Sequence, residues 1–165
     1  MKKLVFSSAL LLSLGLAACG EAEKPIPKNE TIEYPTPKVS EEAQWQEEIT
    51  KLASNADSAA DKFYALEKLL MDYEATDAEI KEFSTHIVDD YKSGNYLSEI
   101  DNHERMLSNI FKSYYVEKNS EGALKDFAFD YFQNMKYTYR GVDTVDSEAV
   151  KSNEEQMNEA IKQIK

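Results

Sequence analysis

The sequence predicts an all-α fold for residues 40–165, a single bundle of five to six amphipathic helices. All four prolines lie at or before Pro37, so the helix-breaking residue is absent from everything that follows. Only Gly94, Gly122 and Gly141 interrupt this stretch, which is rich in the helix-favouring residues Glu, Lys, Ala and Leu. Its apolar residues recur three and four positions apart, as on one face of a helix, and about 125 residues suffice to bury a core.

Two apolar stripes occupy residues 41–74. Ser40 suits the N-cap of a first helix, and Glu41 and Glu42 favour the positive end of its dipole. The stripes comprise Trp45, Ile49, Leu52 and Ala56, then Ala59, Phe63, Leu66, Leu70 and Tyr73. The region therefore forms either one kinked helix or two helices, and the polar break ending in Ser58 favours two.

Capping signals define the next two helices. Thr76 and Glu79 have the spacing of a capping box, and Gly94 suits the position just past a helix end. The face between them carries Ile80, Phe83, Ile87, Val88 and Tyr91. The following helix starts either at Ser98 or within residues 101–104, and its face carries Met106, Leu107, Ile110, Phe111 and Tyr114.

The stretch 123–140 is the most apolar of the domain. Its broad stripe comprises Leu124, Phe127, Ala128, Tyr131, Phe132, Met135 and Tyr139. A helix that is apolar around most of its circumference is usually central, so we expect this helix in the middle of the bundle. The last helix begins near Ser147 and has a thin stripe of Val150, Met157, Ile161 and Ile164. We expect it at the periphery, covering the core.

Residues 1–18 have the organisation of a signal peptide. Lys2 and Lys3 precede an apolar run of about 13 residues, or roughly 20 Å of helix, which is too short to span a bilayer. The run ends in Leu16-Ala17-Ala18-Cys19, which resembles the lipobox of bacterial lipoproteins. The resemblance implies cleavage before Cys19 and a covalent diacylglycerol on that cysteine. Cys19 would then carry either two or three acyl chains. The alternative is an ordinary secretory signal with an incidental cysteine.

A lipid anchor would place the protein on the extracytoplasmic face of a bacterial membrane, in a Gram-positive or a Gram-negative host. Cys19 is the only cysteine, so no internal disulfide can form. Two or three acyl chains hold a protein far more firmly than one. Residues 19–39 contain the four prolines and read as an extended tether, which reaches roughly 60 Å at about 3.1 Å per residue.

The charge and the motif inventory exclude several function classes. A formal net charge of −12 argues against nucleic-acid binding, which requires clustered Lys and Arg. The chain has no nucleophile elbow, no glycine-rich phosphate loop and no zinc-protease motif. We therefore expect no enzymatic activity and no cofactor other than the lipid on Cys19.

One weak metal-site hypothesis arises from two pairs at helical spacing. Glu82 and His86 are four residues apart, as are Glu99 and His103, and each pair shares a helix face. If the two helices form an antiparallel hairpin, the four side chains could approach a divalent ion such as zinc. Ordinary polar pairs are the preferred interpretation, so no metal site is favoured.

Aromatic residues provide the main candidate for a recognition surface. The chain has ten Tyr, seven Phe and one Trp, and tyrosine is enriched at protein interfaces. Most of these rings belong to the expected core stripes. Tyr137, Tyr139 and Arg140 lie at a helix end that a partner could reach, so we predict a partner surface there.

The chain as a whole resembles small lipoproteins of Gram-positive bacteria in plan. That resemblance implies a non-enzymatic protein-interaction module, with a role in an envelope complex, in immunity or in exclusion of mobile elements. The alternative is a small-ligand or metal-binding lipoprotein that uses a pocket between helices. A purely structural or spacer lipoprotein is a third interpretation.

Overall fold

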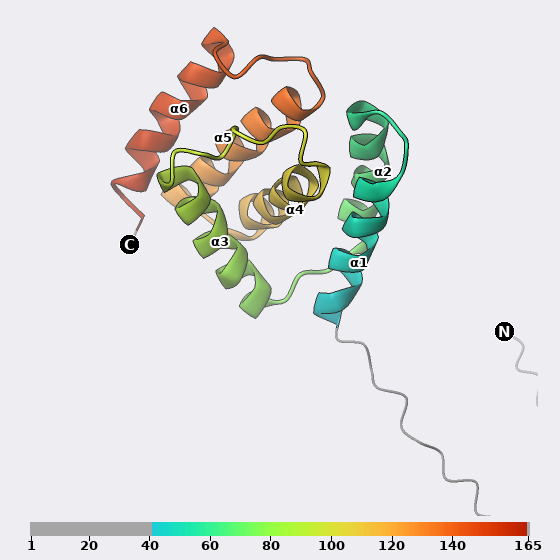
Figure 1. The fold of residues 1–165 in the computed structure, drawn as a ribbon. Coiled ribbons are helices and arrows are strands. Elements are labelled where there is room, and N and C mark those ends of the chain that lie inside the picture. Colours follow the sequence, from blue (N-terminus) through green and yellow to red (C-terminus); the bar gives the residue numbers. More distant parts are fainter. Residues whose placement is uncertain (1–40, 165) are drawn as a thin grey trace, which may run out of the picture. The chain divides into compact units, whose positions relative to one another are not determined.

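A computed structural model describes residues 41–164, with the side chains described from residue 44 onward. The described residues form six helices and no strand, which confirms the predicted all-α bundle (Figure 1). The helices are α1 (Glu41–Ser54), α2 (Ala59–Asp72), α3 (Asp77–Lys92), α4 (His103–Asn119), α5 (Gly122–Tyr139) and α6 (Glu148–Ile161). The predicted signal peptide, the lipidation site Cys19 and the tether lie outside the described residues.

Short polar side chains begin four of these helices. The Ser58 hydroxyl accepts a hydrogen bond from the amide of Asp61, so a fresh cap separates α1 from α2 and residues 41–74 form two helices. Thr76 and Glu79 form the predicted capping box at the start of α3. Asn102, rather than Ser98, caps α4, and Ser147 caps α6 as expected.

Glycines with positive φ follow two of the helices. Gly94, at φ 74°, comes directly after the last turn of α3, and Gly141, at φ 68°, comes after α5. Side chains with a Cβ rarely adopt this left-handed conformation, so glycine allows the chain to leave each helix.

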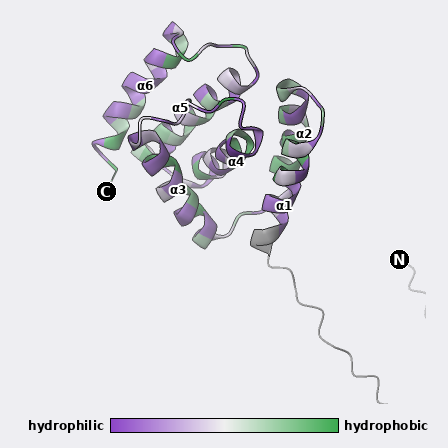
Figure 2. Cartoon of the chain, in the orientation of Figure 1, coloured by the Kyte–Doolittle hydropathy of each residue, from purple (hydrophilic) through white to green (hydrophobic). Residues whose placement is uncertain are grey.

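The central position is shared by two helices. The most apolar stretch, now α5, packs against α2, α3, α4 and α6, as expected for a central helix. However, α4 is just as central, because it packs against α1, α2, α3 and α5 (Figure 1). Helix α6 packs mainly on α5 and is peripheral, as predicted. The apolar residues lie on the facing sides of the helices, and polar residues cover the outer sides (Figure 2).

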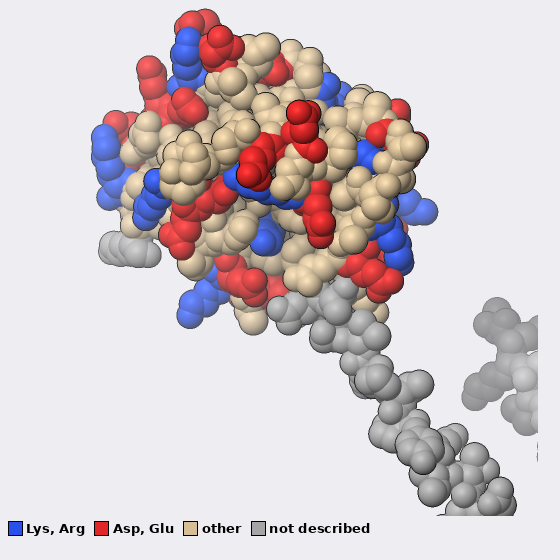
Figure 3. All heavy atoms as spheres, viewed as in Figure 1, with Lys and Arg blue, Asp and Glu red and all other residues tan. Residues whose placement is uncertain are grey.

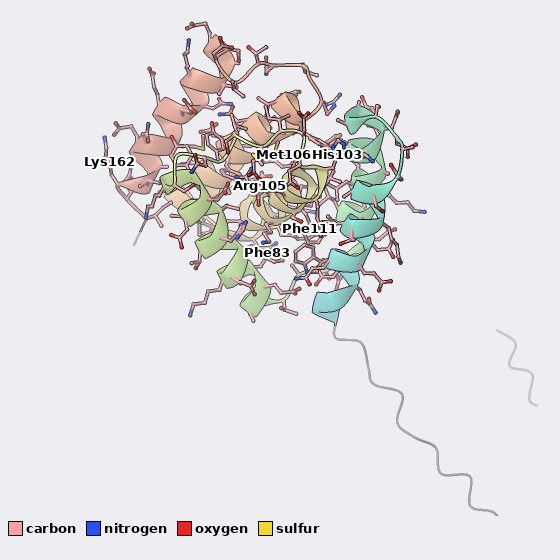
Figure 4. All side chains as sticks on the ribbon, in the orientation of Figure 1. Phe83, His103, Arg105, Met106, Phe111 and Lys162 are labelled. Atoms are coloured by element: carbon pink, nitrogen blue, oxygen red, sulfur yellow. The ribbon has the colours of Figure 1, made fainter. Side chains whose placement is uncertain are left out.

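An aromatic group forms one end of the core, between α1, α3 and α4. The ring of Phe111 stacks on Trp45 with centroids 4.7 Å apart, and it meets Phe83 edge-on at 6.0 Å. Figure 4 shows Phe83 of α3 and Phe111 of α4 facing one another. Tyr115, one turn farther along α4, lies 4.8 Å from Phe111. Such pairs add roughly 0.5–1.5 kcal/mol each beyond the area that they bury.

A lysine is part of the core on the side of α1 and α2. Lys62 is 0 % exposed, and its ammonium donates to the backbone oxygens of Leu52, Ala53 and Asn55 at 2.6 to 3.3 Å. The Asn55 side-chain oxygen accepts a further bond at 2.6 Å. These oxygens lie at the C-terminal end of α1, where helix carbonyls lack intrahelical partners. Lys62 therefore caps α1 from within the following helix, although it has no carboxylate partner among the described residues.

Candidate functional site: a cation–aromatic surface

The three residues of the predicted partner surface at the end of α5 lie on different sides of that helix. Tyr139 is only 2 % exposed, and its hydroxyl lies 3.0 Å from Nδ1 of His103 at the start of α4. Including Tyr139 in the surface was therefore wrong. Residues two positions apart on a helix lie about 200° apart around its axis, so Tyr137 and Tyr139 cannot share a face. Tyr137 and Arg140 are partly exposed.

Arg140 lies among aromatic rings from two helices. Its guanidinium carbon is 5.1 Å from the ring centres of Phe63 and Tyr64 in α2, and 6.0 Å from that of Tyr137. One terminal nitrogen donates to the Tyr64 hydroxyl at 2.8 Å, whereas the buried Nε has no hydrogen-bond partner. Tyr64 itself is 53 % exposed. This group was missed in the sequence because residues 64 and 140 are far apart along the chain.

The same alternation of cations and rings continues along the outside of α5. The ammonium of Lys136 lies 4.5 Å from the Tyr137 ring centre and 4.7 Å from that of Phe132. Phe132 is in turn 6.0 Å from Tyr114 of α4, and Lys118 lies over the Tyr114 ring at 5.0 Å. We call this continuous series the cation–aromatic ladder; its members are Tyr64, Tyr114, Lys118, Phe132, Lys136, Tyr137 and Arg140.

The cations of the ladder contact aromatic rings rather than carboxylates. Among the described residues, Lys118, Lys136 and Arg140 form no ion pair. By contrast, Lys51, Lys151 and Lys162 each pair with a glutamate on their own helix. On the face shown in Figure 3, acidic and basic side chains are interspersed. The ladder thus offers three unneutralised positive charges in a chain with 31 acidic and 19 basic residues.

The segment after α5 adds apolar surface near the ladder. Val142 and Val145 are exposed, and the amide of Val142 donates to the carbonyl of Tyr137 at 2.9 Å. Tyr64, Tyr137 and Val142 provide apolar contact area, and Arg140 provides a planar donor. Aromatic residues and arginine are enriched at protein–protein interfaces, where they contribute much of the binding energy. The arrangement suits recognition of a protein surface that carries carboxylates.

The weak metal-site hypothesis is not supported by the geometry. His86 Nε2 lies 2.8 Å from Oδ1 of Asn109, whereas His103 pairs with Tyr139. His86 therefore meets α4 at Asn109, whereas His103 is the first residue of α4. Positions 103 and 109 are six residues apart, which is about 9 Å along the helix axis. Glu82 is exposed, and Glu99 lies 4.0 Å from Arg105. The described residues hold no group of three or more His, Cys, Asp or Glu side chains positioned for a metal ion.

A second polar group, around Asp90 of α3, was not anticipated from the sequence. One oxygen of Asp90 accepts from Arg105 at 2.7 Å, and the other accepts from the hydroxyl of Tyr131 at 2.6 Å and from Asn109 at 3.2 Å. Arg105 also donates to the backbone oxygens of Asn95 and Tyr96, which fixes the connection between α3 and α4. Burial, together with the charge of Asp90, raises the pKa of Tyr131 well above its usual value. Since every member is paired, this group stabilises the bundle rather than forming a site.

Comparison with known proteins gives no relative. No family model, no curated protein and no solved structure matches the chain. Among the described residues, none of the helices combines the length and the apolar character that crossing a membrane requires.

Proposed function

We propose that the protein is a lipid-anchored, non-enzymatic interaction module on the extracytoplasmic face of a bacterial membrane, and that its helical domain binds an acidic protein partner through the cation–aromatic ladder. The observation that carries the partner site is the stacking of Lys118, Lys136 and Arg140 on partly exposed rings, with no ion pair to a carboxylate of the described residues. The membrane location rests on the lipobox ending in Cys19.

The energetics of the ladder favour a partner contact. An exposed cation–ring pair is worth about 0.5–1 kcal/mol, and the value rises to about 2 kcal/mol or more when the pair is removed from water. A partner that covers Tyr64 and Arg140 would strengthen these pairs, and its carboxylates could pair with the ladder cations, which form no ion pair among the described residues. Charge complementarity would also accelerate association and make it sensitive to salt.

The partner site is tested by charge reversal combined with chemical cross-linking on intact cells. Lys136→Glu with Arg140→Glu should abolish capture of a discrete partner. The matched control, Lys81→Glu with Lys125→Glu, makes the same change in net charge at exposed positions outside the ladder and should leave capture intact. Far-UV circular dichroism confirms that both variants are folded. Equal capture by the two double variants would refute the ladder as the binding surface.

The anchor is tested separately by cell fractionation. The wild-type protein should remain with the membrane fraction, and Cys19→Ala should be released from it. Mass spectrometry of the N-terminal peptide should find acyl chains on Cys19. An unmodified thiol at this position in membrane-associated protein would refute the lipid anchor without affecting the ladder.

A further inference from the structure

A groove between α5 and α6 is lined by carboxylates from both helices. It has a volume of about 550 Å³, which lies within the usual range for small-ligand sites. Asp126 and Asp130 line it from α5, and Glu155 and Glu159 line it from α6. Each pair has a spacing of four residues, so the carboxylates of each helix lie one turn apart on a single face.

Asp130 is the unusual member of this groove. It is 6 % exposed, and no hydrogen bond or ion pair involves its side chain in the part of the chain that the structure describes. Burial, together with the charge of Asp126, raises the pKa of Asp130 to about 6. Buried carboxylates in folded proteins are normally paired with a cation or with hydrogen-bond donors. The side chain borders the groove, and its oxygens are not among the fully buried polar atoms that lack a partner, so they remain accessible to a ligand in the groove.

The other lining residues indicate the kind of cation. Lys162 pairs with Glu159 at 2.6 Å at the exposed edge, but within residues 41–164 no basic side chain pairs with Asp126, Asp130 or Glu155. Between the carboxylates the groove is lined by small apolar residues and by side-chain amides: Gly122, Ala123 and Ala160, with Gln156 and Gln163. An alkyl chain fits against the small apolar residues. The side-chain amide oxygens can accept hydrogen bonds from ammonium groups.

We propose that the α5–α6 groove binds an aliphatic polyamine, with one ammonium group paired to Asp130 and Asp126 and another paired to Glu155. A divalent metal ion fits less well, because the described carboxylates do not converge into a metal-binding group. A polyamine matches the negative charge of the groove and places ammonium groups opposite carboxylates on both helices. This site is separate from the cation–aromatic ladder, which carries charge of the opposite sign, so the two proposals can fail independently.

Isothermal titration calorimetry of the purified protein with spermidine, at 150 mM salt, tests the site. We expect saturable binding by the wild type and at least a tenfold loss of affinity in Asp130→Asn, which keeps the shape of the side chain. Glu148→Gln removes the same charge from an exposed position at the start of α6 and should change affinity less than twofold. Circular dichroism verifies that both variants are folded.

Three outcomes would overturn the proposal. The first is the absence of spermidine binding by the folded wild type. The second is an equal effect of Asp130→Asn and Glu148→Gln, which would indicate non-specific attraction to an acidic surface. The third concerns other probes: if Mg²⁺, or Nα-acetyl-lysine amide with its single ε-ammonium group, binds as tightly as spermidine, the groove recognises a metal ion or a partner's lysine instead.

Discussion

Replacement of Lys62 by methionine tests how a buried lysine holds the first two helices together. Methionine keeps the length of the apolar stem but removes the ammonium group. The ammonium has four oxygen acceptors, three of them backbone oxygens near the C-terminal end of α1. The variant leaves these acceptors without a donor and removes a positive charge from the negative end of a helix dipole.

The expected magnitude follows from opposing contributions. Three hydrogen bonds from a charged donor contribute about 1.5–3 kcal/mol each, whereas desolvation of the ammonium costs several kcal/mol. In the variant, water can reach part of the exposed end of α1 and donate hydrogen bonds to some of the freed backbone oxygens. We therefore expect Lys62→Met to lower the free energy of unfolding by about 2–4 kcal/mol.

Urea unfolding followed by far-UV circular dichroism measures this loss. Lys68→Met is the matched control, because Lys68 lies on the same helix with its side chain exposed. The control should change stability by less than about 0.5 kcal/mol. A loss below about 1 kcal/mol for Lys62→Met, or equal losses for the two variants, would show that the ammonium does not cap α1.

Three further perturbations test other parts of the structure. Phe111→Ala should cost about 3–5 kcal/mol in urea unfolding, because the fully buried ring packs against Trp45, Phe83 and Tyr115; a cost below 2 kcal/mol would contradict the packing. Tyr115→Phe should cost about 1–2 kcal/mol, because it removes the hydroxyl that bonds to the carbonyls of Leu70 and Tyr73, and an unchanged melting temperature would argue against those bonds. The third concerns pH: the pKa of Asp130 is raised to about 6 in the folded state, so folded protein binds more protons than unfolded protein between about pH 4 and 6. The contribution of Asp130 to stability is therefore greatest below about pH 4 and is lost as pH rises towards 6, by about 1 kcal/mol after allowance for solvent screening. Asp126, Glu155 and Glu159 also border the groove, so the comparison is with Asp130→Asn, whose stability should fall less over this interval; identical pH profiles would refute the assignment.

Local signals in the sequence predicted the helices because those signals involve neighbouring residues. The capping box of Thr76 and Glu79 and the periodic stripes depend only on spacings of three and four residues. The prediction for residues 123–140 was correct about burial but did not identify α4 as equally central. The stripe of α4 is no longer than the others, and its central position results from how four neighbours pack around it.

The candidate site was only partly predictable, because its contacts join distant segments. Tyr137 and Arg140 were predicted, but Tyr64 reaches Arg140 only after α2 packs beside α5. Tyr139 failed as a surface residue because its position around the helix turns it towards His103. Likewise, nothing local marks Lys62 as buried or Asp130 as unpaired. Tertiary packing determines both.

Site-specific photo-cross-linking at position 64 in intact cells tests the central claim most directly. A photoreactive phenylalanine analogue replaces Tyr64, the most exposed ring of the ladder, and in a matched strain it replaces Glu82 on the exposed side of α3. We expect a discrete cross-linked protein from position 64 that is absent from position 82 and is lost when Lys136 and Arg140 are both changed to glutamate. Cross-linking of the same protein from both positions, or its persistence after the charge reversal, would contradict an interaction through the cation–aromatic ladder.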